Sequence, residues 1–389
     1  MKTPHDPIHA KSSAPGADTR SHGLSRRQVL KGLGASAAGL IAARSGYPLH
    51  VPGPASARPG QSIAPRVAIA KVTTYDLATV RQQVRDLIDS LGGLGDIVRP
   101  GDRVAIKVNL TGGSGATPLP GISPIESYVT HPAVVQALGE LIRDAGAGSI
   151  YIVEGVAAYR TFFDWDYVPV ADAIGARLIN LNWSHPYESF AHVPVGDDWY
   201  IYPEFTFNAL LQEVDTFVSI PKMKCHGICG VTHSMKNQVG LVPYSAYDTS
   251  PEDLNRSLLH GSDDEVRQRL PRVVVDLNRA RPIHLALIDG IKTVEGGEGP
   301  WQPHLAPVEA NVLIAGRNPV ATDAVATAIM GFDPTASSPF APFCMADNHL
   351  NLACEAGLGT NRLEEIATVG ASIDEVVHPF NLNAPSETF

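Results

Sequence analysis

Short apolar runs alternate with segments of helical periodicity along the first half of the chain. The apolar runs are rich in valine and isoleucine and predict buried strands. We place these strands at residues 67–72, 104–108, 149–153, 178–181 and 216–220. Between them, residues 77–91 and 132–145 repeat their apolar positions with the spacing of helices that pack on one side.

The second half continues this alternation, with a helix at 264–280 and strands at 284–288 and 312–315. Asn318 and Pro319 then open a helix that carries Asp323 and runs to Met330. Residues 191–207 predict a hairpin inserted before the strand at 216–220. Continuous apolar strands separated by amphipathic helices are buried on both faces. The pattern therefore predicts an α/β fold, Rossmann-like, with a mainly parallel sheet, helices on both faces and a small hairpin insertion.

The stretch from residue 216 to residue 243 concentrates reactive side chains. Its strand ends at Pro221, because proline cannot donate to a sheet ladder. We expect a polar turn over residues 222–227 and a helix over residues 228–239, which Gly240 and Pro243 terminate.

Four side chains of this stretch are typical metal ligands, namely Cys225, His226, Cys229 and His233. On the expected helix, Cys229, His233 and Asn237 share one face, with Lys236 beside them. These residues predict a transition metal or an iron–sulfur cluster, although their spacing matches no common zinc-finger or ferredoxin pattern. The alternative is that Cys225 and Cys229 pack as small apolar residues or form a disulfide.

Lysines of the same stretch indicate a different ligand. Lys222, Lys224 and Lys236 surround the start of the expected helix, a position that suits a phosphate or a carboxylate. The predicted cofactor- or anion-binding residues are Lys107, Asn109, Lys222, Lys224, Lys236 and Asn237. Solvated surface lysines are the alternative.

Polar residues also follow the other predicted strands. Lys107 and Asn109 end one strand, Glu154 ends the next, and Asp289 and Gly290 begin an acidic loop after a third. In parallel sheets, ligands bind beyond the carboxyl ends of the strands. We therefore expect a functional rim there, with His131, His226 and Asp289 as candidate acid–base residues.

The N-terminal segment has the pattern of an export signal. Residues 25–31 (SRRQVLK) form a twin-arginine box, an apolar run follows at 33–43, and residues 55–57 (ASA) offer a cleavage site. The run is too short to span a membrane. We predict a signal peptide at 1–57, a linker at 58–65, an α/β domain at 66–371 and a tail at 372–389. The protein would meet the twin-arginine translocation machinery and reach the periplasm or the extracellular space.

Charge and cysteine content narrow the functional classes. The net charge is −10, and the predicted signal is itself basic. Such an acidic protein is a poor partner for nucleic acid or for anionic membranes. Four cysteines in an exported chain allow two disulfides, with Cys225–Cys229 and Cys344–Cys354 as the pairs closest in sequence.

Several motifs occur together in one order along residues 66–371. They are residues 104–109 (VAIKVN), 130–135 (THPAVV), 220–224 (IPKMK), 226–227 (HG), 231–232 (VT), 234–237 (SMKN), 289–290 (DG), 295–300 (EGGEGP) and 318–323 (NPVATD). This set resembles the domain of unknown function family 362. Many members join the domain to a ferredoxin-like module, which implies a redox or cofactor-related setting. This chain has no C-x-x-C-x-x-C run of that kind.

The lysine-bearing stretch is also similar in outline to that of nickel-pincer lactate racemases. That resemblance implies Lys222, Lys224 or Lys236 as cofactor anchor and His131 or His226 as base. Three functions remain open from the sequence. They are a metal- or cofactor-dependent, redox-associated enzyme, a metal-independent enzyme acting on an anionic small molecule, and a non-catalytic extracytoplasmic protein that binds a metal or an anion.

Overall fold

The fold is built on a mixed sheet of eleven strands within the part of the chain that the structure describes, residues 64–116 and 122–382 of the computed structural model. The order along its main path is β13-β1-β12-β10-β7-β2-β3-β4; β8 and β11 also pair with β10, and β9 pairs with β8. In chain order the strands are β1 (Arg66–Lys71), β2 (Arg103–Val108), β3 (Ser149–Glu154), β4 (Ala176–Asn180), β7 (Thr216–Ile220), β8 (Lys222–His226), β9 (Gly230–Thr232), β10 (Leu285–Glu295), β11 (Ala306–Val308), β12 (Val312–Gly316) and β13 (Ala367–Gly370).

Most strand pairs along this path are parallel. Strands β10, β7, β2, β3 and β4 run in one direction, whereas β12 is antiparallel to both of its neighbours, β1 and β10. The predicted hairpin is confirmed as a separate antiparallel pair, β5 (Phe190–Pro194) and β6 (Glu204–Asn208). The mainly parallel α/β architecture expected from the sequence is therefore confirmed.

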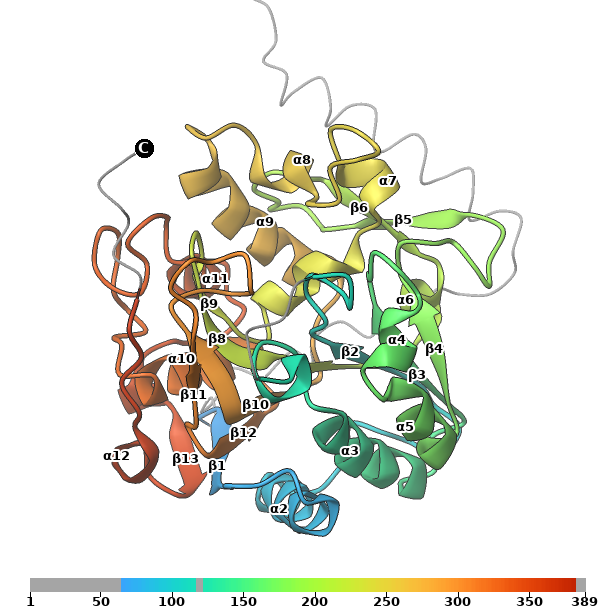
Figure 1. The fold of residues 1–389 in the computed structure, drawn as a ribbon, viewed down its shortest axis with the longest axis vertical. Coiled ribbons are helices and arrows are strands. Elements are labelled where there is room, and N and C mark those ends of the chain that lie inside the picture. The colour runs from blue at the N-terminus through green and yellow to red at the C-terminus, as the bar shows by residue number, and fades with distance from the viewer. Residues whose placement is uncertain (1–63, 117–121, 383–389) are drawn as a thin grey trace, which may run out of the picture. The chain divides into compact units, whose positions relative to one another are not determined.

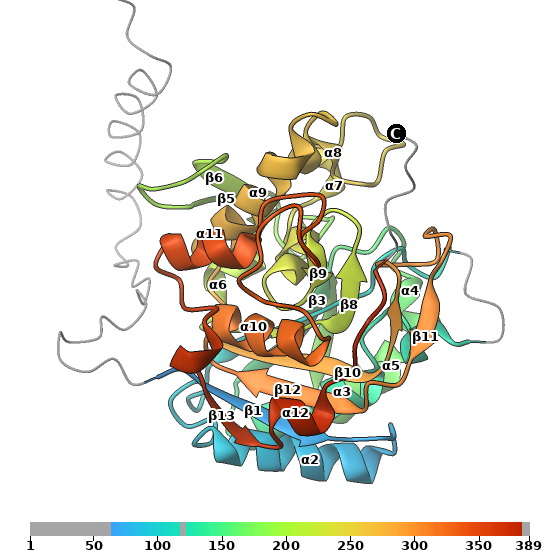
Figure 2. The ribbon, with the colours of Figure 1, turned by 90° about the vertical axis from the view of Figure 1, so that its left-hand side faces the viewer.

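Helices cover both faces of the sheet (Figure 1). One face carries α2 (Leu77–Ser90), α3 (Pro132–Asp144) and α5 (Tyr167–Ile174), and the other carries α9 (Val266–Ala280), α10 (Pro319–Ile329) and α11 (His349–Glu355). Figure 2 shows α2 on one side of β1 and β12, and α10 on the other. Because successive strand residues point to opposite faces, Val67 and Ile69 enter one apolar cluster and Ala68 enters the other.

The remaining helical elements are short and lie between these layers and the loops. They are α4 (Thr161–Asp164), α6 (Leu210–Glu213), α7 (Tyr244–Tyr247), α8 (Ser257–His260), α12 (Ile373–Val376), η1 (Pro124–Glu126), η2 (Lys236–Leu241) and η3 (Leu363–Glu365).

Two long helices begin as their sequences predict. Asn318 caps α10, with its side-chain oxygen 2.9 Å from the Ala321 amide, and Pro319 occupies the first turn. His131 caps α3 in the same way, because its Nδ1 accepts from the Ala133 amide at 3.1 Å. Short-range chemistry alone determines these two starts.

The prediction of a helix over residues 228–239 is wrong. The chain continues after Pro221 as β8, turns back as β9 at Gly230, and forms only the 3₁₀ segment η2. Strand β8 pairs with β10, so its backbone groups are satisfied by a partner far away in the sequence. Gly230 has φ 76°, which favours glycine at this reversal. The shared helix face of Cys229, His233 and Asn237 therefore does not exist.

The prediction of a loop from Asp289 onward is also wrong. Strand β10 runs on to Glu295, because β8 and β11 pair with its second half, while β12 pairs with its first half up to Gly290. Asp289 and Gly290 consequently lie inside the sheet.

The predicted export signal lies outside the residues that the structure describes. Within those residues, no helix is long and apolar enough to cross a membrane. All four cysteines are free, so neither of the disulfides considered above is present.

Candidate active site

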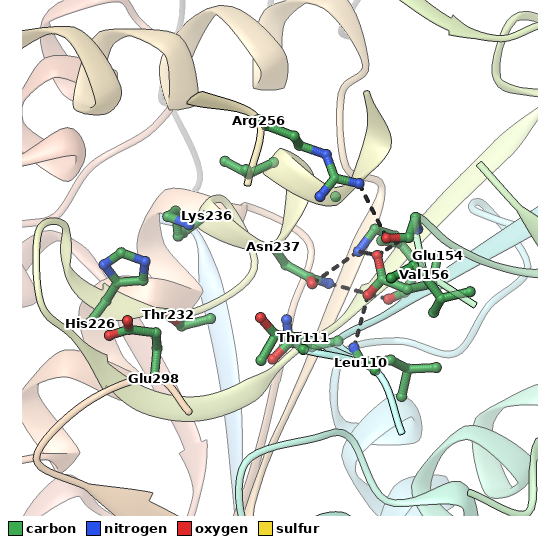
Figure 3. A pocket seen from close by; sticks show the side chains of 18 of the residues that line it. Leu110, Thr111, Glu154, Val156, His226, Thr232, Lys236, Asn237, Arg256 and Glu298 are labelled. Atoms are coloured by element: carbon green, nitrogen blue, oxygen red, sulfur yellow. Dashed lines mark hydrogen bonds and ion pairs between the residues drawn. The ribbon is translucent and has the colours of Figure 1, made fainter. Parts of the chain in front are cut away.

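A pocket of about 110 Å³ lies where β2 and β3 end, under the segment that links β9 to α7. Its walls come from the loops after β2 and β3, from β8 and β9, from η2, and from the segment before α8. Its polar lining residues are Lys107, Asn109, Thr111, Glu154, Lys224, His226, Thr232, Lys236, Asn237, Tyr244, Arg256 and Glu298. Figure 3 shows His226 and Lys236 at one side of this pocket and Glu154 at the other, with Asn237 between them.

A buried ion pair forms the wall at the strand ends. Lys107 Nζ lies 2.8 Å from Glu154 Oε1 and also donates to Asn237 Oδ1 at 3.2 Å. Glu154 accepts in addition from the amides of Leu110 and Gly155, at 2.9 and 2.8 Å. Burial lowers the pKa of Lys107, and the charge of Glu154 opposes that shift. Lys107 and Glu154, the pocket ion pair, therefore balance each other's charge.

Glycines let the backbone approach this ion pair. A Cβ on Gly240 would collide with Glu154 Oε1 and would lie 2.8 Å from Lys107 Nζ. The turn that follows Lys236 can therefore close over the ion pair only because residue 240 has no side chain.

Lys224 is fully buried and donates only to main-chain carbonyls. Its Nζ lies 2.7 Å from the oxygens of Tyr128 and Glu298. Burial lowers the pKa of Lys224 well below its ordinary value. The lysine thereby fastens the segment around Glu298 to the pocket.

The proton on His226 is positioned by the backbone. Its Nδ1 accepts from the amides of Ile228 and Cys229, at 3.1 and 3.2 Å. Burial lowers the pKa of this imidazole to about 3. A neutral ring with an occupied Nδ1 carries its proton on Nε2. His226 is therefore a hydrogen-bond donor toward the pocket, and the role of base predicted for it would require the other tautomer.

Glu298 lies next to His226 and is held in its charged form. Burial raises the pKa of this carboxyl, but His226 and hydrogen bonds from its neighbours outweigh burial and lower it. The donors are the Gly227 amide at 3.0 Å, Trp301 Nε1 at 2.8 Å and Gln302 Nε2 at 2.8 Å. Glu298 is thus a fixed carboxylate at the pocket wall.

Like Lys224, two further cationic side chains of the pocket have no carboxylate partner among the described residues. Lys236 Nζ makes no hydrogen bond or ion pair with any residue in that part of the chain. Arg256 is 7% exposed, and it donates through Nε to the Val242 oxygen at 2.7 Å and through Nη2 to the Gly155 oxygen at 3.2 Å. Its guanidinium also stacks over the Tyr244 ring at 4.1 Å. The pocket therefore carries positive charge beyond what its own carboxylates neutralise.

The segment that carries Lys236 is anchored by α10. The carboxylate of Asp323, in α10, accepts from the amides of Ser234 and Met235, each at 2.9 Å. Asp323 closes the family-like motif that begins at Asn318. The motif thus positions the start of η2.

Two further polar atoms at the pocket have no hydrogen-bond partner among the described residues. They are Oδ1 of Asn109, which is 8% exposed, and Oγ1 of Thr232, which is 4% exposed. Buried polar atoms are nearly always paired, so such orphans indicate a missing ligand or water.

Three residues predicted for the site lie elsewhere, in a buried cluster with Tyr75. Lys222 Nζ and Asp289 Oδ2, both inaccessible to solvent, are 2.7 Å apart, and Tyr75 donates to Asp289 Oδ1 at 2.8 Å. The His131 amide donates to Asp289 Oδ2 at 2.9 Å, and the His131 ring stacks on Tyr75 with centroids 3.6 Å apart. Burial lowers the pKa of His131 to about 4. This cluster holds β8 and β10 together and does not line the pocket.

The candidate metal ligands are dispersed. Cys225 and Cys229 pack into the apolar core, where burial raises the pKa of their thiols to about 12 and about 11. His233 Nε2 lies 3.2 Å from the sulfur of Met330, behind the pocket. Within residues 64–116 and 122–382, no three histidine, cysteine or acidic side chains gather as a metal-ligand set. The helix that would have joined these residues is absent.

Sequence patterns gave no sign that Arg256, Tyr244 or Gly240 belongs to the site. Arg256 stands in a loop between short helices, with φ 56°, and no motif marks it. Only the tertiary fold brings this loop to the ends of β2 and β3.

Comparison with curated proteins gives one relative. The chain is 25% identical over 328 residues to the thylakoid-associated protein sll1697 of Synechocystis, covering 82% of this chain and 91% of that protein.

Two of the solved structures that match have low similarity to this chain. One is a Thermotoga maritima protein from a structural genomics consortium, with a TM-score of 0.34, and the other is the lactate racemase apoprotein of Thermoanaerobacterium thermosaccharolyticum, with 0.33. Both are 12% identical over 64% of this chain. The match spans a little over half of each structure, 57% and 54% respectively.

The family model described as domain of unknown function, DUF362, matches residues 104–328. That range contains both strand ends, β8, η2 and Arg256, and therefore the whole pocket. The chain belongs to the DUF362 family.

Proposed function

We propose that this protein is an enzyme that binds a small anionic molecule, bearing a carboxylate or a phosphate, in the pocket around Lys236 and Arg256. The observation that carries the proposal is that both cations line the pocket without a carboxylate partner in the described part of the chain. An unpaired charge removed from water is costly, and an anion between the two side chains would relieve that cost.

The charge distribution of the protein supports the proposal. The chain as a whole is acidic, with a net charge of −10. Among the described residues of the pocket, Lys236 and Arg256 face Glu298 alone, since Lys107 and Glu154 balance each other. A local excess of positive charge in an acidic protein selects and attracts anions.

Available hydrogen-bond donors add directionality. Nε2 of His226 carries a proton, and Oγ1 of Thr232 has no partner among the described residues. Together with the two cations they would surround an anionic group on several sides, as specific sites for small molecules do.

The test is calorimetric titration of the full chain with acetate, glycolate, oxalate and inorganic phosphate. Lys236→Met should weaken binding of the best of these anions by about tenfold to a hundredfold, since a hydrogen bond to a charged group contributes about 1.5–3 kcal/mol. Lys71→Met is the matched control, because Lys71 is an exposed lysine of β1. Its affinity should equal that of the wild type.

If Lys236→Met and Lys71→Met lose the same amount of anion affinity, binding depends on the overall charge of the protein and the proposal is refuted. Absence of binding to every anion would also refute it.

A further inference from the structure

Lys236 differs from the other lysines predicted for the site in having an amine with no hydrogen-bond partner among the described residues. Lys107, Lys222 and Lys224 each donate to at least two oxygens, at distances between 2.7 and 3.2 Å. Lys236 reaches the same pocket, and no described residue accepts from its Nζ. A lysine with this freedom is available to react with a ligand as well as to bind it.

The surroundings of Lys236 lower its pKa, so the cation that binds the anion also gives up its proton more readily than an exposed lysine does. Burial lowers its pKa, the charge of Glu298 raises it, and the positive charge of Arg256 lowers it again. A desolvated lysine beside another cation is a recognised form of activated nucleophile. Here the second cation is fixed, because Arg256 is held by main-chain oxygens and by the Tyr244 ring.

We propose that Lys236 is a nucleophile that forms an imine with the carbonyl group of a small anionic aldehyde or ketone. This inference rests on the proposed anion site and names the substrate class for it. Arg256 would hold the anionic group, while Nε2–H of His226 would donate to the carbonyl oxygen.

The size of the pocket limits the substrate. Its volume of about 110 Å³ is below the roughly 150 Å³ of an engineered cavity that accommodates benzene. A short oxo acid such as glyoxylate, with a carboxylate and an aldehyde on adjacent carbons, is therefore the appropriate probe.

The chemical step is balanced without any further reactant. The Nζ lone pair attacks the carbonyl carbon, the C–N bond forms, and the carbonyl π electrons move to oxygen, which takes up a proton. One proton leaves nitrogen to give a carbinolamine. Loss of the hydroxyl group with a second proton, as water, then gives the imine. The neutral Nε2–H of His226 stabilises the negative charge that develops on oxygen.

The experiment is reductive trapping. The full chain is incubated with glyoxylate and cyanoborohydride, and the resulting secondary amine is located by peptide mass spectrometry. Glycolate, which has the same carboxylate but no carbonyl group, serves as the competitor. Lys236→Arg is the matched variant, since it keeps a cation in the pocket but cannot form an imine.

We expect rapid labelling of Lys236 in the wild type, slowing by at least tenfold when glycolate saturates the site, and loss of that label in Lys236→Arg. Binding of glycolate without preferential labelling of Lys236 would overturn the inference and leave the anion site standing. Labelling of Lys236 at the same rate as exposed lysines such as Lys71, unaffected by glycolate, would also overturn it. Absence of binding by either acid would remove the proposed function and this inference together.

Discussion

Asp289→Asn should destabilise the protein strongly, because within the described part of the chain its carboxylate is the only ion-pair partner of Lys222, a lysine with no solvent exposure. Asp289 accepts from Lys222 Nζ at 2.7 Å, from the Tyr75 hydroxyl at 2.8 Å and from the His131 amide at 2.9 Å. Removing one partner of a buried pair typically costs about 3–5 kcal/mol, because the other charge remains buried.

The structure also sets an upper limit to this cost. In the variant, Lys222 can lose its proton instead of staying charged. With an ordinary pKa of about 10.4, deprotonating a lysine at pH 7 costs about 4.6 kcal/mol. At pH 9 the same limit falls to about 2 kcal/mol. The sign follows from proton binding: above the lowered pKa of the folded variant, the unfolded chain binds more protons, so the variant gains stability as pH rises.

Urea unfolding of the full chain at pH 7 and at pH 9 measures both quantities. We expect a loss of about 3–4.6 kcal/mol at pH 7 that shrinks to about 2 kcal/mol or less at pH 9, with an unchanged m-value. Asp144→Asn is the matched control, because the Arg143–Asp144 pair is exposed (46% and 55%) and should contribute less than about 1 kcal/mol. A loss at Asp289 equal to that of the control, or one independent of pH, would refute the reasoning. Lost turnover with intact stability would instead restore the catalytic role predicted for Asp289 from the sequence.

Three further changes test other parts of the structure. Gly240→Ala should weaken anion binding by at least tenfold in calorimetry, because its Cβ collides with the pocket ion pair, whereas Gly95→Ala, with open space around its Cβ, should bind normally. His349 is inaccessible to solvent with both ring nitrogens unpartnered among the described residues, and burial lowers its pKa to about 3. When the pH falls from 7.5 to 5, His349 takes up a proton in the unfolded chain but not in the folded protein. The unfolding free energy of the wild type should therefore fall by about 2 kcal/mol relative to that of His349→Leu. A difference between the two proteins that stays the same at both pH values would contradict this. Cys225 and Cys229 are buried free thiols, so iodoacetamide should modify them only after the protein unfolds. If mass spectrometry finds both thiols modified rapidly in the native protein, their buried placement is wrong.

Short-range patterns were sufficient for the layers of the fold. Apart from β10, which runs on to Glu295, the predicted apolar strands and the helices at 77–91 and 132–145 were identified to within a residue or two, because each is one uninterrupted local pattern. The start of α10 at Asn318 and Pro319 was likewise readable from capping chemistry.

The site was only partly predictable, because its lysines differ in their partners and not in their sequence surroundings. Lys222 and Lys224 stand two residues apart on β8, yet one neutralises Asp289 and the other lines the pocket. The strand with which β8 pairs determines which groups surround its side chains. Nothing in the sequence indicated that this partner is β10.

The sequence by itself determined the family motifs, the α/β class and the conclusion that polar groups gather at the ends of the parallel strands. Only the tertiary structure decided that residues 228–239 form a turn, a short strand and η2, and that Arg256 joins the pocket. The physical reason is that helix starts and buried strands depend on neighbouring residues, whereas the balance of charge in a pocket depends on groups more than a hundred residues apart, such as Lys107 and Asn237, whose contact only folding creates.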